Sequence, residues 1–255
     1  MCILTQIFAR NTCKSLPKTR HTIFKRSFRW DSSNKLHPDK ALVVKHEPGS
    51  EAPRLAPIPV VFVGSAALEN DRGTFWTLGD RLSQELALRG FECYQFDLPF
   101  EKQTNDTAKS ILDRMSSHLR SLVQSTGIPF PPILYAERLG CLIAQTYVSS
   151  HPLYSLVLDS PPLSCASLAS WPGLADRLPL PLPEFTFEPK FPVLVLEELS
   201  AGGVLVNSRL VKEGADYMVV RDDDTQPGGT GESVESRDVP NRLLALERWI
   251  DELGC

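Results

Sequence analysis

The sequence predicts an α/β fold in which helices cover both faces of a mostly parallel central sheet. Two observations lead to this prediction. From residue 58 onward, strand-like and helix-like segments alternate, which is typical of parallel strands joined by crossover helices. Most strand-like segments are unbroken runs of valine, leucine and isoleucine, as expected for strands that are buried on both faces. A chain of 255 residues is long enough for one large domain of this class.

Seven short segments are predicted strands. They cover residues 42–46, 58–63, 92–96, 132–135, 155–158, 192–196 and 217–220. Apolar residues at helical spacing predict five helices. These cover residues 75–88, 111–123, 139–150, 206–213 and 241–253.

Two segments interrupt this alternation. Residues 161–191 contain seven prolines, so we expect an extended cover over the carboxyl edge of the sheet, with one short helix around residues 163–169. Residues 222–240 carry six acidic residues, several turn-forming residues and no apolar periodicity. This second segment is predicted to be a mobile acidic loop.

The first 30 residues differ in charge from the rest of the chain. They contain seven of the 27 Lys and Arg residues and none of the 31 acidic residues. Dispersed basic residues, Ser and Thr, and apolar residues at near-helical spacing are typical of a mitochondrial transit segment. We therefore expect residues 1–30 to direct import into the matrix, residues 31–56 to form a linker with a possible edge strand, and residues 57–255 to form the domain. The alternative is a disordered basic tail.

Composition excludes several classes of function. Without its first 30 residues the chain carries 20 basic and 31 acidic residues, which argues against nucleic acid or an anionic membrane as a partner. No apolar run approaches the roughly 20 residues of a membrane-spanning helix. The six cysteines form neither a C-x-x-C pair nor a Cys/His cluster, so we expect no disulfide framework and no metal site. We also expect no cofactor.

Four local motifs follow one another at a characteristic spacing. They are PVVFVGS at 59–65, LALRGF at 86–91 with DLP at 97–99, ILYAERLG at 133–140 with IAQ at 143–145, and HP at 151–152 with LVLD at 156–159. In this order they resemble the α/β-hydrolase fold, over about four fifths of the chain. The resemblance implies that the third motif is the nucleophile elbow, the sharp turn between a strand and the following helix.

Measured against this resemblance, the catalytic triad is missing. The elbow pattern G-x-S-x-G places a serine hydroxyl next to backbone N–H donors, but Arg138 stands at that position. A guanidinium can neither attack a carbonyl nor be deprotonated. The resemblance also implies a histidine before the last helix, yet no histidine follows His151. The implied acid position, at residues 200–202, holds no carboxylate, although Glu197 and Glu198 precede it. No catalytic residue is therefore predicted.

The candidate binding residues surround the elbow. A buried Arg138 must meet an anion or pair with a carboxylate, for which the sequence offers Asp159, Glu197 and Glu198. An ion pair that plugs an inactive site, an anionic ligand, and exposure to solvent are the three alternatives for this arginine.

Besides Arg138, the candidate binding residues are Glu137, Asp159 and Ser65. Glu137 and Asp159 are predicted to lie next to Arg138, and Ser65 stands where the oxyanion loop begins, where it could bind a ligand oxygen or form a turn. Cys141 and Ser160 are conceivable substitute nucleophiles, but neither has a histidine nearby in the chain order. His118 and His151 have structural interpretations on or at the end of helices.

The sequence thus predicts a catalytically degenerate α/β-hydrolase-like protein that acts inside mitochondria as a binding or assembly factor. Its expected partner is a mitochondrial protein or an anionic small molecule. Two alternatives remain. One is an active esterase, thioesterase or acyltransferase with a non-standard site, and the other is a carrier of an anionic small molecule bound at Arg138.

Overall fold

A seven-stranded sheet forms the centre of the computed structural model, which describes residues 41–69, 74–221 and 238–254. The strands run in the order β1-β3-β2-β4-β5-β6-β7. Their bounds are Leu42–His46 (β1), Val60–Gly64 (β2), Cys93–Asp97 (β3), Ile133–Glu137 (β4), Ser155–Asp159 (β5), Val193–Glu198 (β6) and Asp216–Val220 (β7). Strand β1 is antiparallel to β3, and the remaining pairs are parallel. The predicted mostly parallel sheet is confirmed.

Six α-helices and three short 3-10 helices join or follow these strands. The α-helices are Ala66–Glu69 (α1), Thr74–Leu88 (α2), Ala108–Ser125 (α3), Gly140–Val148 (α4), Arg209–Lys212 (α5) and Asp238–Glu252 (α6). The 3-10 helices are Ala166–Ser170 (η1), Leu199–Ala201 (η2) and Val204–Asn207 (η3). These counts refer to the ranges that the structure describes.

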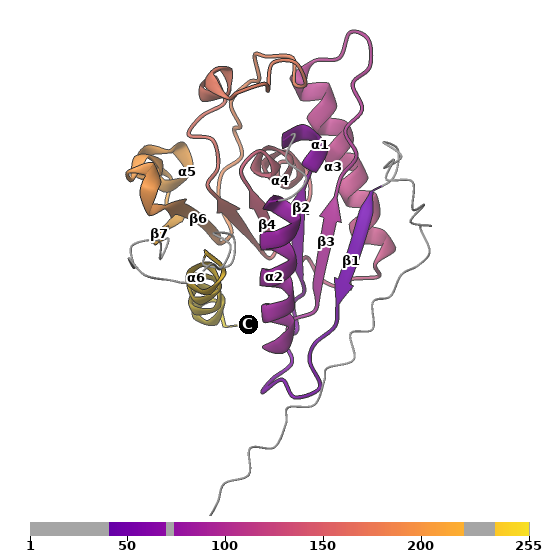
Figure 1. Ribbon diagram of the computed structural model, residues 1–255, viewed down its shortest axis with the longest axis vertical. Helices are drawn as coiled ribbons and strands as arrows, with labels where there is room; N and C mark the ends of the chain where they lie inside the picture. The colour runs from indigo at the N-terminus through magenta and orange to yellow at the C-terminus, as the bar shows by residue number, and fades with distance from the viewer. Residues whose placement is uncertain (1–40, 70–73, 222–237, 255) are drawn as a thin grey trace, which may run out of the picture.

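The helices cover both faces of the sheet and form two cores (Figure 1). Val61 and Val63 of β2 pack with α3 and α4, whereas Val60 and Phe62 pack with α2 and α6. Successive strand residues point to opposite faces, so a run of apolar residues in one strand supplies both cores. This explains why most of the central strands read as unbroken aliphatic segments.

The segment before β7 differs from its prediction. One helix is expected over residues 206–213, but the structure has η3 and then α5, separated at Ser208. Ser208 is extended, with φ −63° and ψ 155°, and its hydroxyl accepts a hydrogen bond from the Val211 N–H. A serine that caps a new helix in this way competes with continuing the earlier one.

The predicted loop at 222–240 is too long at its carboxyl end. Residues 238–240 already belong to α6, because proline is tolerated in the first turn of a helix, where its missing N–H has no intrahelical partner. The remainder of that predicted loop, residues 222–237, and the predicted transit segment lie outside the described residues.

The proline-rich segment 161–191 packs against one of the two cores. Apart from η1 it has no helix or strand, and four of its leucines are buried in the core that contains α3 and α4. They are Leu168, Leu174, Leu178 and Leu182. The segment therefore contributes apolar surface to the core although its backbone is mostly irregular.

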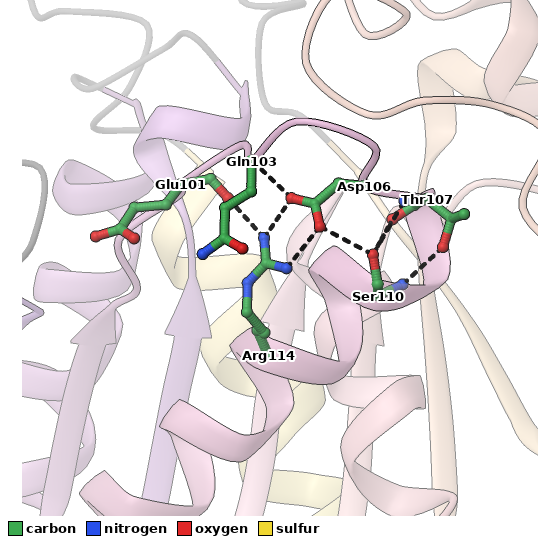
Figure 2. A network of polar contacts seen from close by, with 6 residues as sticks. All are labelled: Glu101, Gln103, Asp106, Thr107, Ser110 and Arg114. Carbon is green, nitrogen blue, oxygen red and sulfur yellow. Dashed lines mark hydrogen bonds and ion pairs between the residues drawn. The ribbon is translucent and has the colours of Figure 1, made fainter.

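The loop after β3 is tied to α3 by a polar network (Figure 2). The Thr107 hydroxyl accepts from the Ser110 N–H at 3.1 Å, and the Ser110 hydroxyl accepts from the Thr107 N–H at 3.0 Å, which forms a capping box. Arg114 donates to both carboxylate oxygens of Asp106, at 2.8 and 2.7 Å, and holds the pKa of Asp106 well below its usual value. This network fixes the amino end of α3.

Candidate functional site at the turn between β4 and α4

Arg138 occupies a sharp turn between β4 and α4, as predicted. Its backbone is in the left-handed region, with φ 49°, and its N–H donates to the Asp159 carbonyl at 2.8 Å. Gly140 follows two residues later, and a Cβ there would lie 2.9 Å from the Val63 carbonyl oxygen, so only glycine allows α4 to approach β2 this closely. A strained residue between a strand and a helix is the geometry of a nucleophile elbow.

The Arg138 side chain pairs with Glu69, at the end of α1. Arg138 Nε lies 3.8 Å from Glu69 Oε2, and the other carboxylate oxygen accepts the Leu139 N–H at 3.0 Å. The guanidinium carbon lies 5.7 Å from the centre of the Trp171 ring. The Glu69 side chain is 7% exposed and that of Arg138 is 38% exposed. The Glu69 carboxylate thus bridges the Arg138 guanidinium and the Leu139 N–H next to it.

This partner differs from the three that the sequence suggested, and the strand order explains why. Strand β4 lies between β2 and β5, with Val63 opposite Ala136 and Glu137 opposite Asp159. The segment after β2 is therefore as near to the elbow as the segment after β5. The sequence interpretation considered only the carboxylates after β5 and β6, and so it missed Glu69.

Asp159 is paired with Arg242 of α6. Arg242 Nε donates to Asp159 Oδ2 at 2.7 Å, and the Tyr135 hydroxyl donates to the same oxygen at 2.6 Å. The Ser160 hydroxyl donates to Oδ1 at 2.9 Å. The side chains of Asp159 and Arg242 are 1% and 4% exposed. Asp159 therefore belongs to a buried ion pair that links the sheet to α6.

Glu197 and Glu198 have other partners as well. Glu197 is buried and accepts hydrogen bonds from the N–H groups of Val204 and Leu205, at 2.8 and 2.9 Å, and from the Tyr217 hydroxyl at 2.5 Å. Glu198 accepts from the Ser200 hydroxyl. Both carboxylates thus order the segment that follows β6.

Glu137 lies directly before Arg138 and is buried opposite Asp159. Its pKa is raised from the ordinary 4.5 to about 8, first by burial and then by the negative charge of Asp159, while the positive charge of Arg242 acts in the opposite direction. The protonated form of the side chain is therefore favoured to a higher pH than in an exposed glutamate. Glu137 and Arg138 are adjacent at the elbow, with Asp159 beside them.

Ser65 has a structural role at the start of α1. Its hydroxyl donates to the Leu98 carbonyl at 2.9 Å and accepts from the Leu68 N–H at 3.3 Å. Of the two predicted roles, the structure shows the turn. Ser65 nevertheless contributes to the elbow, because it caps the single helical turn that carries Glu69.

Three other residues considered from the sequence, Cys141, Ser160 and His151, take part in local structure. Cys141 is buried, its sulfur lies 3.3 Å from the Ala136 carbonyl oxygen, and burial raises its pKa well above the usual value. Ser160 bonds to Asp159. The His151 ring stacks on Tyr147, with 4.6 Å between ring centres, at the end of α4. Each of these side chains is engaged in local structure.

The described residues contain no group of three or more His, Cys, Asp or Glu side chains arranged to hold a metal ion. No helix in the described ranges is long and apolar enough to cross a membrane.

Between α4, the proline-rich segment and α5 lies a cavity of about 40 Å³, lined in part by Leu142, Cys165 and Leu210. Small-molecule sites usually enclose roughly 300–1,000 Å³, so this cavity is too small for a substrate.

Comparison with known proteins places the chain in a well-populated fold. No protein-family model matches it, and no curated protein matches it by sequence. Among solved structures, Thermogutta terrifontis esterase 2 superposes with a TM-score of 0.53 at 13% identity, covering 94% of this chain and 97% of that one.

Two further solved structures are similar. An α/β-hydrolase enzyme from the metagenome of lagoon sediments at Mar Chica, Morocco, has a TM-score of 0.54 at 14% identity and covers 85% of this chain and 97% of its own. A sugar hydrolase from Lactococcus lactis has a TM-score of 0.52 at 16% identity, with 84% and 96% covered. The predicted α/β-hydrolase fold is confirmed.

Proposed function

We propose that this chain, which has the α/β-hydrolase fold, is a non-catalytic member of that fold and acts as a binding or assembly factor in the mitochondrial matrix. The observation that supports the proposal is the position of Glu69. Its carboxylate is held by Arg138 and by the Leu139 N–H at the turn where hydrolases of this fold carry their nucleophile.

Each requirement of acyl transfer is unmet at this turn. Arg138 offers no nucleophile, and no histidine follows His151 in the chain to act as a base. The N–H of the residue after the nucleophile stabilises the negative oxygen of the transition state in this fold. Here the corresponding Leu139 N–H is bonded to Glu69, whose negative charge would repel an oxyanion.

We expect the purified protein to hydrolyse p-nitrophenyl acetate no faster than the buffer does. The matched control is Arg138→Met, which removes the guanidinium and keeps a long side chain. Any residual rate should be the same in both proteins, because Arg138 does no chemistry. A wild-type rate well above background that Arg138→Met abolishes would show that the elbow is catalytic, and would refute the proposal.

The fold neighbours support a second candidate, an active hydrolase with a non-standard site, since several of them are named as esterases or hydrolases. In that case Glu137 is the group to examine, because a buried carboxyl group with a pKa of about 8 can donate a proton at neutral pH. The hydrolysis assay separates the two candidates, since Glu137→Gln would abolish a genuine activity of this kind.

The mitochondrial part of the proposal depends on the charge of the first 30 residues, with seven basic and no acidic side chains. Residues 1–30 fused to a fluorescent reporter are expected to direct it to mitochondria, because matrix import selects basic amphipathic segments. As a control, changing Arg10, Lys14 and Arg20 to glutamine should leave the reporter in the cytosol. Cytosolic signal from the unchanged fusion, with an uncleaved full-length native protein, would contradict the matrix location.

A further inference from the structure

We propose that the elbow is a binding site for a monocarboxylate, and that Glu69 occupies this site as an internal ligand that an external carboxylate replaces. The inference rests on the proposed function, because a non-catalytic elbow is free to bind an anion without reacting with it. It goes further by naming the chemical class of the ligand and the contact that controls access.

Two donors of different kinds meet at a single carboxylate. Leu139 N–H is 3.0 Å from Glu69 Oε1, and Arg138 Nε is 3.8 Å from Oε2, so each oxygen faces its own donor. A planar group with two acceptor oxygens matches this arrangement. The donors lie at the amino end of α4, a helix of nine residues whose dipole adds positive potential there. The bound Glu69 carboxylate thus shows which chemistry the site accepts.

The geometry also indicates that Glu69 is an imperfect ligand. Its 3.8 Å contact with Arg138 is longer than a hydrogen bond, so the tethered side chain reaches one donor well and the other poorly. A free carboxylate has no tether and can approach both donors. The Arg138 side chain is 38% exposed, which gives a ligand from solvent a route to the guanidinium.

The charge of the surroundings favours a monoanion. When a monocarboxylate replaces the Glu69 carboxylate, the charge beside Arg138 does not change. A phosphate dianion would add a negative charge near the buried carboxylate of Asp159, where repulsion is poorly screened. The site should therefore bind acetate in preference to phosphate.

The test is an NMR titration of the purified full-length protein with sodium acetate at constant ionic strength, monitoring the Leu139 backbone amide. We expect acetate to bind Glu69→Ala at least about tenfold more tightly than the wild-type protein, because a tethered carboxylate competes at a high effective concentration. The double variant with Arg138→Met should lose this gain. Glu188→Ala, which removes an exposed glutamate elsewhere, should titrate like the wild-type protein.

A second variant covers the possibility that Glu69→Ala fails to fold. Glu69→Gln keeps the shape and the acceptor for Leu139 but removes the charge opposite Arg138, so acetate should again bind more tightly than in the wild-type protein. Equal acetate affinity in the wild-type protein and in a folded Glu69 variant would overturn the inference. Phosphate that binds as tightly as acetate would overturn the assignment to a monocarboxylate.

The inference and the proposed function fail in different ways. If the wild-type protein hydrolyses p-nitrophenyl acetate and Arg138→Met abolishes that rate, the proposed function is wrong, whatever the affinity of Glu69→Ala for acetate. If the wild-type protein does not hydrolyse the ester and folded Glu69→Ala binds acetate no better than the wild type, the inference is wrong and the proposed non-catalytic role stands.

Discussion

Replacing Arg242 by methionine is expected to lower the free energy of unfolding by roughly 3–5 kcal/mol, the usual cost of removing one partner of a buried ion pair. The change leaves Asp159 buried, with the Tyr135 and Ser160 hydroxyls still bonded to it but without its cation. It also removes the positive charge that lowers the pKa of Glu137. Urea denaturation monitored by circular dichroism gives this quantity.

The matched control lies on the same helix. Arg248 of α6 pairs with Glu252 one turn away, and its side chain is 74% exposed. Arg248→Met should change the stability by less than about 0.5 kcal/mol, because exposed ion pairs contribute little. Asp159→Asn combined with Arg242→Met should recover part of the loss, since no unpaired charge then remains. Equal effects of the two arginine substitutions would show that the Asp159–Arg242 pair is not buried.

Glu137→Gln is expected to make the protein more stable than the wild type at pH 9, by roughly 3–5 kcal/mol from the difference between the two pKa values. The folded protein holds the Glu137 proton up to a pKa of about 8, whereas the unfolded chain releases it near 4.5. The wild-type protein therefore loses stability as the pH rises from about 4.5 to about 8, and the variant lacks this loss. Below pH 4.5 the two proteins should be similarly stable.

The pH dependence distinguishes this effect from a general change in packing. The quantity to measure is the difference in unfolding free energy between variant and wild type, from urea denaturation at several pH values between 4 and 9. Glu188→Gln, at a side chain that is 71% exposed, should give a difference that does not vary with pH. A constant difference for Glu137→Gln as well would mean that Glu137 is already ionised at pH 7.

Most of the fold could be predicted because its signals are local. Most central strands are aliphatic runs between turn residues, and helices α2, α3 and α6 carry apolar residues at helical spacing. The elbow could also be placed, since the motif ILYAERLG at 133–140 resembles the corresponding turn of the α/β-hydrolase fold. The break at Ser208 could not be predicted. The sequence fits one continuous helix equally well, and only the structure shows that the Ser208 hydroxyl caps a new helix, α5.

The partners of the elbow could not be predicted, because ion pairs depend on which chain segments become neighbours in three dimensions. Glu69 is 69 residues before Arg138 in the chain, and Arg242 is 83 residues after Asp159. The order of the strands brings Glu69 to Arg138, and the packing of α6 against the sheet brings Arg242 to Asp159. Given the strand order, the carboxylate after β2 would have been an obvious candidate.

The central claim, that the elbow holds an internal ion pair in place of a nucleophile, is tested most directly by intact-protein mass spectrometry after treatment with a fluorophosphonate. Serine hydrolases are labelled at the activated serine of their elbow. We predict an unchanged mass for this protein, because Arg138 stands at that position and Ser160 and Ser65 are bonded to Asp159 and Leu98. A stoichiometric adduct that maps to Ser65 or Ser160 would contradict the account.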